Sequence, residues 1–208
     1  MRKKTEEKRQ AILAAARQTF RESGFETSSM DDIAMRAGAS KATVYGYFPS
    51  KEALFLEVIL DVGEAHGDAA FKELIASENL SDGLRRFGEQ HLAFISTPGA
   101  IALARLAITE GGRSGLGREF YARGPGAMIE RLARYLEGAS QRGQLRKCDP
   151  NQMAEHLISL YEAGLLIRCL FGYPLQLDEQ RRDTSVARAV DVFMNFYGVP
   201  RDDAKPEW

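Results

Sequence analysis

Residues 27–55 read TSSMDDIAMRAGASKATVYGYFPSKEALF and are the most informative part of the chain. It contains three short helical signals that lie end to end and are separated by residues typical of turns. Two of them have helix-turn-helix spacing. A second helix held across a tight turn fits a DNA major groove, where base edges can be read. The stretch therefore favours a module that binds nucleic acid.

The first of these helices has start and stop signals. Ser28 or Ser29 can act as its N-cap, and Asp31 and Asp32 then lie in the first turn, next to the positive end of the helix dipole. Gly38 follows the periodic apolar run, where a glycine in the left-handed conformation ends a helix at little cost. These signals predict a short helix that stops at a tight turn.

The next helix has its own signals. Ser40 is placed to cap it, and Val44 and Phe48, four residues apart, give it one apolar face. Pro49 disfavours helix at Phe48, and Ser50 is placed to cap the helix that follows. The side chains left largely outside are those of Lys41, Thr43, Tyr45 and Tyr47.

At these residues the chain resembles the TetR family of transcriptional regulators. The matching positions run from about Arg9 to Phe55 and include residues 11–16, Phe20, Gly24-Phe25, Thr27, Ile33, Ala34, Ala37, Gly38, Ser40, Tyr45, Phe48, Lys51 and Leu54. The resemblance implies an all-α fold. Residues 1–52 would form a three-helix DNA-binding domain with a helix-turn-helix, residues 53–200 a larger helical ligand-binding and dimerisation domain, and residues 201–208 a frayed tail. The alternative is an ordinary bundle of amphipathic helices.

Charge is divided unevenly along the 208 residues, although the net charge is only −1. Residues 1–51 hold ten Lys/Arg and six Asp/Glu, a net of +4, and the remainder carries a net of −5. A basic N-terminal module on an acidic body suits a protein that presents one end to a polyanion, although chance clustering gives the same excess. With no signal peptide and no apolar run near the roughly 20 residues that span a bilayer, we expect a cytoplasmic protein without membrane contact.

Helical periodicity continues beyond Leu54, and alternation of period two is nearly absent, so no sheet is expected. Gly124-Pro125-Gly126 either kinks or splits one of the helices. The helices are predicted near 51–77, 81–96, 99–110, 117–142, 150–171 and 179–197.

The last two helices both have apolar residues at helical spacing, and the one at 150–171 is apolar on most of its circumference, which implies burial on two sides. In the TetR family two C-terminal helices typically pair across a two-fold axis, and the resemblance implies a homodimer that reads a palindrome. A core made within one chain is the alternative. The predicted dimer residues are Leu157, Leu160, Tyr161, Gly164, Leu165, Val190, Phe193, Met194 and Tyr197.

The resemblance also implies DNA contacts, position by position. The base-contact candidates are Ser40, Lys41, Ala42 and Thr43, and the phosphate-contact candidates are Thr27, Ser28, Tyr45, Tyr47 and Lys51. Each has a simpler alternative, because Ser40 can merely cap a helix, Lys51 can be solvated and Thr27 can close a turn. Gly46 departs from the family, which usually has a bulkier residue there; it costs about 1 kcal/mol of helix stability.

By resemblance the C-terminal domain is a sensor. A small, hydrophobic effector would bind in it, move the helix at 51–77 and release the operator from a repressor. The candidate pocket residues are polar or aromatic groups within apolar stretches. They are His66, His91, Phe94, Arg105, Glu110, Tyr161, Glu162 and Arg168. An internal carboxylate such as Glu110 or Glu162 is the alternative partner for Arg105.

Other functions lack their motifs. No Glu is followed by His at i+3, the three histidines are scattered, and no nucleophile elbow is visible, so no enzyme, cofactor or metal site is expected. The glycine-rich segment 111–117 lacks the Gly-Lys-Ser/Thr of a phosphate-binding loop. The alternative function is a helical module that binds a protein partner.

Overall fold

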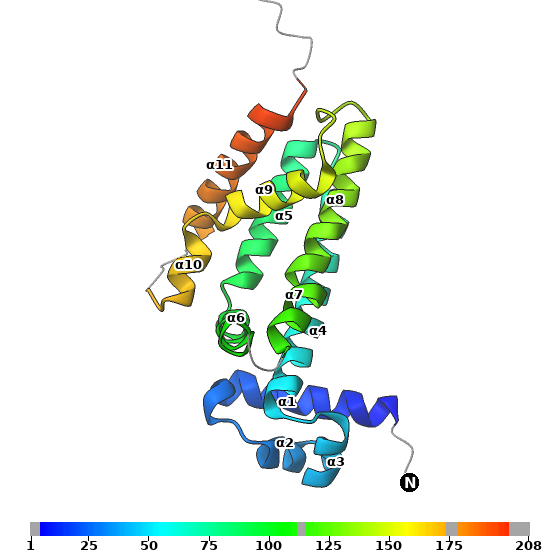
Figure 1. Cartoon of the computed structure of the whole chain (residues 1–208), viewed down its shortest axis with the longest axis vertical. Helices are drawn as coiled ribbons and strands as arrows, with labels where there is room; N and C mark the ends of the chain where they lie inside the picture. Colours follow the sequence, from blue (N-terminus) through cyan, green and yellow to red (C-terminus); the bar gives the residue numbers. More distant parts are fainter. Residues whose placement is uncertain (1–4, 112–114, 174–178, 200–208) are drawn as a thin grey trace, which may run out of the picture. The chain divides into compact units, whose positions relative to one another are not determined.

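The computed structural model describes residues 5–111, 115–173 and 179–199, which are all-α as predicted (Figure 1). Within these ranges the only β pairing is an isolated antiparallel bridge between Leu145 and Gly198. The predicted tail at 201–208 and part of the glycine-rich segment 111–117 lie outside the described residues. The helices are α1 (Glu6–Thr27), α2 (Met30–Arg36), α3 (Lys41–Tyr47), α4 (Lys51–Ala76), α5 (Leu80–Ile95), α6 (Pro98–Glu110), α7 (Leu116–Arg123), α8 (Pro125–Gln141), α9 (Pro150–Glu162), α10 (Leu165–Leu170) and α11 (Glu179–Tyr197).

The chain divides into two compact units. Unit 1 comprises Met1–Ala65 and Ile95–Gly124, and unit 2 comprises His66–Phe94 and Pro125–Trp208. Helix α4 therefore contributes residues to both units. The functional boundary after residue 52 stays a prediction, because a division by contacts does not say which residues bind DNA or a ligand.

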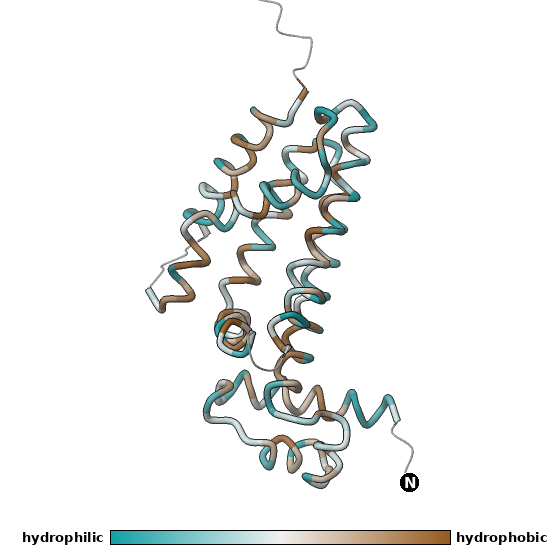
Figure 2. The backbone as a smooth tube through the Cα atoms, in the orientation of Figure 1, coloured by the Kyte–Doolittle hydropathy of each residue, from teal (hydrophilic) through white to brown (hydrophobic). Residues whose placement is uncertain are grey.

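Unit 1 is built around α1. Thr5 caps this helix by accepting a hydrogen bond from the Lys8 amide, and Gly24 breaks its geometry at φ 77° and ψ 172°. Phe25, just beyond the break, stacks on Phe55 of α4 with ring centroids 4.6 Å apart. Figure 2 shows that α6 is largely hydrophobic, and its fully buried Leu103 completes the same core. The other large buried residues there are Ile12, Leu13, Phe20, Met30, Ile33, Val44, Phe48, Leu54, Leu56 and Val58.

Unit 2 has a core in which α9 packs against α8 and α11. Tyr161 of α9 is fully buried and donates a 2.7 Å hydrogen bond from its hydroxyl to the Leu84 carbonyl of α5. Burial holds the pKa of this hydroxyl well above its usual value. Gly88 of α5 leaves room for the ring, since a Cβ atom there would lie 2.5 Å from Tyr161 Cε1.

Two of the predicted helices differ in the structure. The helix predicted at 150–171 is wrong as a single element, because α9 ends at Glu162 and Gly164 has a φ of 70°. That left-handed conformation cannot continue a right-handed helix. The helix predicted at 117–142 is split rather than kinked: Gly124 has φ −107° and ψ −98°, and α8 starts at Pro125.

No single helix in the described ranges has the length and apolar content to cross a membrane. Helices α5 and α6 meet that criterion only when they are counted together as a bent pair.

Candidate nucleic-acid interface

Helices α2 and α3, of seven residues each, flank a turn whose geometry follows the sequence signals. Ser29 is the N-cap of α2 and accepts a hydrogen bond from the Asp32 amide. Gly38 adopts φ 55°, as expected for a glycine that ends a helix. Ser40 caps α3, which ends at Tyr47 ahead of Pro49. Local chemistry therefore fixes the helix-turn-helix.

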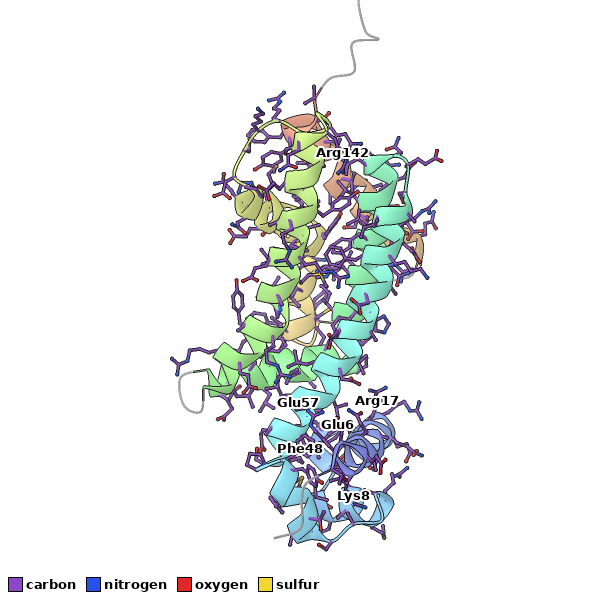
Figure 3. The ribbon with its side chains drawn as sticks, turned by 90° about the vertical axis from the view of Figure 1, so that its right-hand side faces the viewer. Glu6, Lys8, Arg17, Phe48, Glu57 and Arg142 are labelled. Atoms are coloured by element: carbon purple, nitrogen blue, oxygen red, sulfur yellow. The ribbon has the colours of Figure 1, made fainter. Side chains whose placement is uncertain are left out.

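A lysine from α1 secures the turn. The Lys8 ammonium donates to the carbonyl oxygens of Ala37 at 3.2 Å and Gly38 at 3.0 Å. Figure 3 labels Lys8 among the side chains of unit 1. These carbonyls lie at the end of α2, where a cation also interacts favourably with the helix dipole. Lys8 thus holds the turn that orients α3.

Helix α3 has one buried and one open face. Val44 is fully buried in the core of unit 1, whereas Lys41, Ala42 and Tyr45 are exposed. Tyr45 exposes 44% of its surface, which is high for a large aromatic residue. The open face therefore offers an ammonium, a methyl group and a phenol, which are groups that contact bases and phosphates.

Ser40 and Thr43 are hydrogen-bonded to each other at the start of α3. The Ser40 hydroxyl accepts from the Thr43 amide at 3.1 Å, and the two hydroxyl oxygens are 2.8 Å apart. Ser40 thus acts as the cap that was its simpler alternative. Thr43 is only half-buried, so its methyl group remains a possible contact for a base.

Lys41 forms an ion pair with α2. Its ammonium lies 2.8 Å from Oδ2 of Asp31, and the two side chains are 56% and 64% exposed. The hydrogen bond to Asp31 raises the pKa of Lys41 above its usual value. The adjacent Asp32 has a different role, because its carboxylate accepts from the Ser29 hydroxyl at 2.6 Å. Of these two carboxylates, only Asp31 pairs with Lys41.

Tyr47 faces the start of α1. Its hydroxyl accepts from the Thr5 amide at 2.8 Å and donates to the Thr5 carbonyl at 3.3 Å. The predicted phosphate contact by Tyr47 is untested, but its hydroxyl already has backbone partners. Tyr45, two residues earlier, lies on the exposed face and is the better placed of the two for a phosphate.

Lys51 binds backbone rather than solvent. Its ammonium donates to the carbonyl oxygens of Phe25 at 2.8 Å, Ser28 at 3.1 Å and Glu26 at 3.4 Å. It also lies 4.3 Å from the centroid of the Phe25 ring. In this arrangement Lys51 closes the connection between α1 and α2, and its predicted phosphate contact stays a prediction.

Thr27 and Ser28 lie in the same connection. Their hydroxyls donate to the carbonyl oxygens of Ser23 and Gly24, respectively. Ser28 is only 5% exposed, whereas Thr27 is exposed. Of this pair, Thr27 is the one with surface left for a phosphate.

Sequence reasoning missed the roles of Lys8, Thr5 and Asp31. Lys8 is 29 residues from Ala37 and Thr5 is 42 residues from Tyr47. No local pattern signals a contact over such a separation. The sequence predicts only a helix-dipole role for Asp31, because an acidic residue ten positions before a lysine gives no signal of helical pairing.

A second charged cluster in unit 1 centres on Glu57 of α4, which Figure 3 labels. Its carboxylate accepts from Arg9 at 2.6 Å and also pairs with Arg123 of α7. The hydrogen bond from Arg123 is the main cause that holds the pKa of Glu57 below its usual value. Nearby, Tyr47, Leu106 and Glu110 are among the residues that line a surface groove of about 620 Å³.

The predicted ligand-pocket residues divide between the units, with Arg105 and Glu110 in unit 1 and the other six in unit 2. In unit 2, His91 Nε2 lies 2.9 Å from Oε1 of Glu162, and the His91 side chain is 8% exposed. The His66 and Phe94 rings lie 5.3 Å apart. Arg168, like Arg105, is exposed. Unit 2 thus brings His91 together with Glu162, and His66 together with Phe94.

Most predicted dimer residues are already buried within the chain. Leu160 and Met194 are half-buried, and Gly164 is exposed. On α11, exposed apolar surface belongs instead to Val192 and Phe196, which are 54% and 63% exposed. The members with 8% or less of their surface exposed are Leu157, Tyr161, Leu165, Val190, Phe193 and Tyr197.

Among the described residues, no three His, Cys, Asp or Glu side chains are arranged to hold a metal ion.

Comparisons with known proteins identify the family. Residues 12–58 match the domain of bacterial regulatory proteins of the tetR family, and residues 82–199 match the C-terminal domain of AefR-like transcriptional repressors. The HTH-type transcriptional regulator RutR of Escherichia coli K12 is 46% identical over 55 residues, which are 26% of each chain. The matched segment thus spans about a quarter of that regulator.

Solved structures extend the likeness to nearly the whole chain. The flavonoid-responsive regulator FrrA is 34% identical, with a TM-score of 0.67, over 95% of this chain and 100% of its own. A Mesorhizobium loti structure assigned to the TetR family is 28% identical, with a TM-score of 0.81, over 94% of this chain and 100% of its own. The chain belongs to the TetR family of bacterial transcriptional regulators.

Proposed function

We propose that the protein is a homodimeric repressor that binds a palindromic DNA operator and is released from it by a small hydrophobic ligand.

 

The observation that carries this proposal is the open face of α3, where Lys41, Ala42 and Tyr45 are exposed across a turn fixed by Gly38. A helix presented in this way fits the major groove. One short helix reads few bases, whereas two helices related by a two-fold axis read a palindrome. The proposed activity is binding without a catalytic step, and it takes place in the cytoplasm.

Within this proposal the residues of unit 1 have separate roles. Lys41 and Thr43, with Ala42 between them, contact base edges, and Tyr45 contacts a phosphate. Ser40 acts mainly as the cap of α3, and Thr27 is a second phosphate contact. Tyr47, Lys51 and Ser28 support the module through their backbone hydrogen bonds.

The dimer interface we propose uses the exposed side of α11 and the end of α9. Val192 and Phe196 offer apolar surface there, whereas residues such as Phe193 and Tyr197 are occupied within their own chain. Leu160, Met194 and Gly164 from the predicted set keep part of their surface free to meet a partner. The buried residues of the predicted dimer set would then pack beneath this surface within their own chain.

For the effector we propose an aromatic or otherwise hydrophobic compound that binds within unit 2. His91, Glu162 and Tyr161 would supply polar groups, and the Phe87 ring near His91 and Tyr161 would supply apolar surface, a combination common in small-molecule sites. FrrA is described as flavonoid-responsive, and it is similar over nearly the whole chain, so flavonoids are suitable first probes. Ligand and operator would each weaken binding of the other.

A DNase footprint on the DNA upstream of the protein's own gene, at two salt concentrations, tests the proposal. We expect protection of one palindromic site that weakens as salt rises, because phosphate contacts release counterions. If no site is protected there, selection from random DNA follows. Failure to enrich any sequence would overturn the proposal in favour of a helical module that binds a protein partner.

A further inference from the structure

We propose that Asp31 is a specificity-determining residue, which holds the Lys41 ammonium so that the lysine discriminates between operator and other DNA. This inference rests on the proposed DNA-binding function. It concerns a contact within unit 1 that joins the two helices of the helix-turn-helix, Asp31 on α2 and Lys41 on α3.

The geometry makes Asp31 the direct partner of Lys41. The ammonium and the carboxylate oxygen are 2.8 Å apart, and both side chains remain more than half exposed. The pair therefore lies at the surface that α3 presents, where a DNA phosphate competes with Asp31 for the same ammonium. Asp32 is the neighbouring acid, but its carboxylate accepts from the hydroxyl of Ser29 and is not part of this pair.

The Asp31–Lys41 pair affects binding to random DNA and binding to the operator differently. On random DNA, Lys41 gains a phosphate but gives up a carboxylate, which then lies unpaired near a polyanion. On the operator, an ammonium with three donors can keep Asp31 and also donate to guanine O6 or N7. Since a free lysine side chain rotates widely, the contact with Asp31 also restricts its direction. Asp31 therefore weakens binding to random DNA more than binding to the operator.

The test compares the wild-type protein with Asp31→Asn, which keeps the shape and removes the charge. Affinity and its salt dependence are measured on the selected operator and on a random duplex of the same length. We expect Asp31→Asn to bind random DNA about fivefold more tightly, because its Lys41 does not have to leave an exposed ion pair before it binds a phosphate. The salt slope on random DNA should steepen by about 0.9 for each module. Operator affinity should change less, so the ratio of the two affinities falls.

Two further variants separate this role from a general effect of charge. Glu22→Gln removes a carboxylate from another exposed pair in the same unit, 2.7 Å from Arg36, and should leave the affinity ratio unchanged. Lys41→Ala removes the partner, and adding Asp31→Asn to it should then leave the salt slope on random DNA unchanged. Circular dichroism and thermal unfolding confirm that each variant is folded.

The outcomes distinguish this inference from the proposed function. An equal gain on both DNAs, a ratio that matches that of Glu22→Gln, or the same effect in the Lys41→Ala background would overturn the role of Asp31 while leaving operator binding intact. If the wild-type protein itself shows no preference for any DNA, the proposed function fails first. A lower ratio that depends on Lys41 supports the inference.

Discussion

Gly46 of α3 and Gly88 of α5 both lie inside helices, but their surroundings differ. A Cβ atom added at Gly46 would meet nothing within 4 Å, whereas one at Gly88 would lie 2.5 Å from the Tyr161 ring and 2.8 Å from Val186. The glycine in unit 2 thus allows a close approach between helices. The glycine in unit 1 lies on a helix that presents an open face, and packing within the chain does not require it.

The largest expected effect on stability is that of Gly88→Ala. The added methyl group has to displace the buried Tyr161 ring, and overpacking of this kind costs about 3 kcal/mol. Chemical denaturation of the full chain measures the free energy of unfolding. Stability within about 0.5 kcal/mol of the wild type would mean that α5 and α9 separate easily, and that the comparison with Gly46 does not hold.

The next largest effect on stability comes from comparing two lysines of unit 1, Lys51 and Lys41. Lys51→Met keeps the apolar stem but removes the ammonium from three carbonyl oxygens. We expect a loss of about 2 kcal/mol of unfolding free energy. The matched control Lys41→Met should leave the free energy of unfolding close to that of the wild type, because it breaks only an exposed ion pair.

DNA binding by the same two variants separates structural from contact roles. A Lys51→Met protein that is as stable as the wild type but binds all DNA weakly would support the phosphate contact that the sequence predicts for Lys51.

Gly46→Ala should raise the free energy of unfolding, whereas Gly88→Ala should lower it. Alanine stabilises a helix interior by about 1 kcal/mol relative to glycine, and the space at Gly46 is open. Thermal unfolding of the variant should therefore shift to higher temperature. A decrease would show that α3 needs glycine for its conformation.

The smallest expected effect is the loss of stability at low pH that comes from the ion pairs of Glu57 with Arg9 and Arg123. Because Arg123 and Arg9 hold the folded-state pKa of Glu57 below its usual value of 4.5, its ionised form stabilises the fold above that pH. This contribution is lost as the pH falls through the lowered pKa. Glu57→Gln should cost about 0.5 kcal/mol at pH 7 and progressively less in acid.

Glu64→Gln, an exposed change on the same helix, is the control for the acid titration. A constant difference between the wild type and Glu57→Gln from pH 7 to pH 3 would exclude the ion pairs as its cause.

The helix-turn-helix was predictable from the sequence because its signals are local. The caps Ser29 and Ser40, the left-handed Gly38 and the stop before Pro49 act within a few residues of the helix ends that they define. A cap and its amide partner are neighbours in the chain, so the sequence contains both halves of the interaction.

Two features were not predictable for the opposite reason. The break at Gly164 interrupts an apolar pattern that continues from Leu157 to Leu165, and periodicity does not register one residue with a φ of 70°. The hydrogen bonds of Lys51 are the second feature, because its carbonyl partners come from residues more than 20 positions away. Apolar periodicity likewise showed that Phe193 is buried, but not whether its own chain or a partner covers it.

The contact between Tyr47 and Thr5 has a practical consequence for handling the protein. The hydroxyl at the end of α3 holds the backbone at residue 5, so an affinity tag joined on the N-terminal side of Thr5 would be attached beside α3. A tag attached there would compete with the duplex that we propose α3 binds. A tag at the other end, or cleavage of an N-terminal one, is therefore the sounder choice for binding assays.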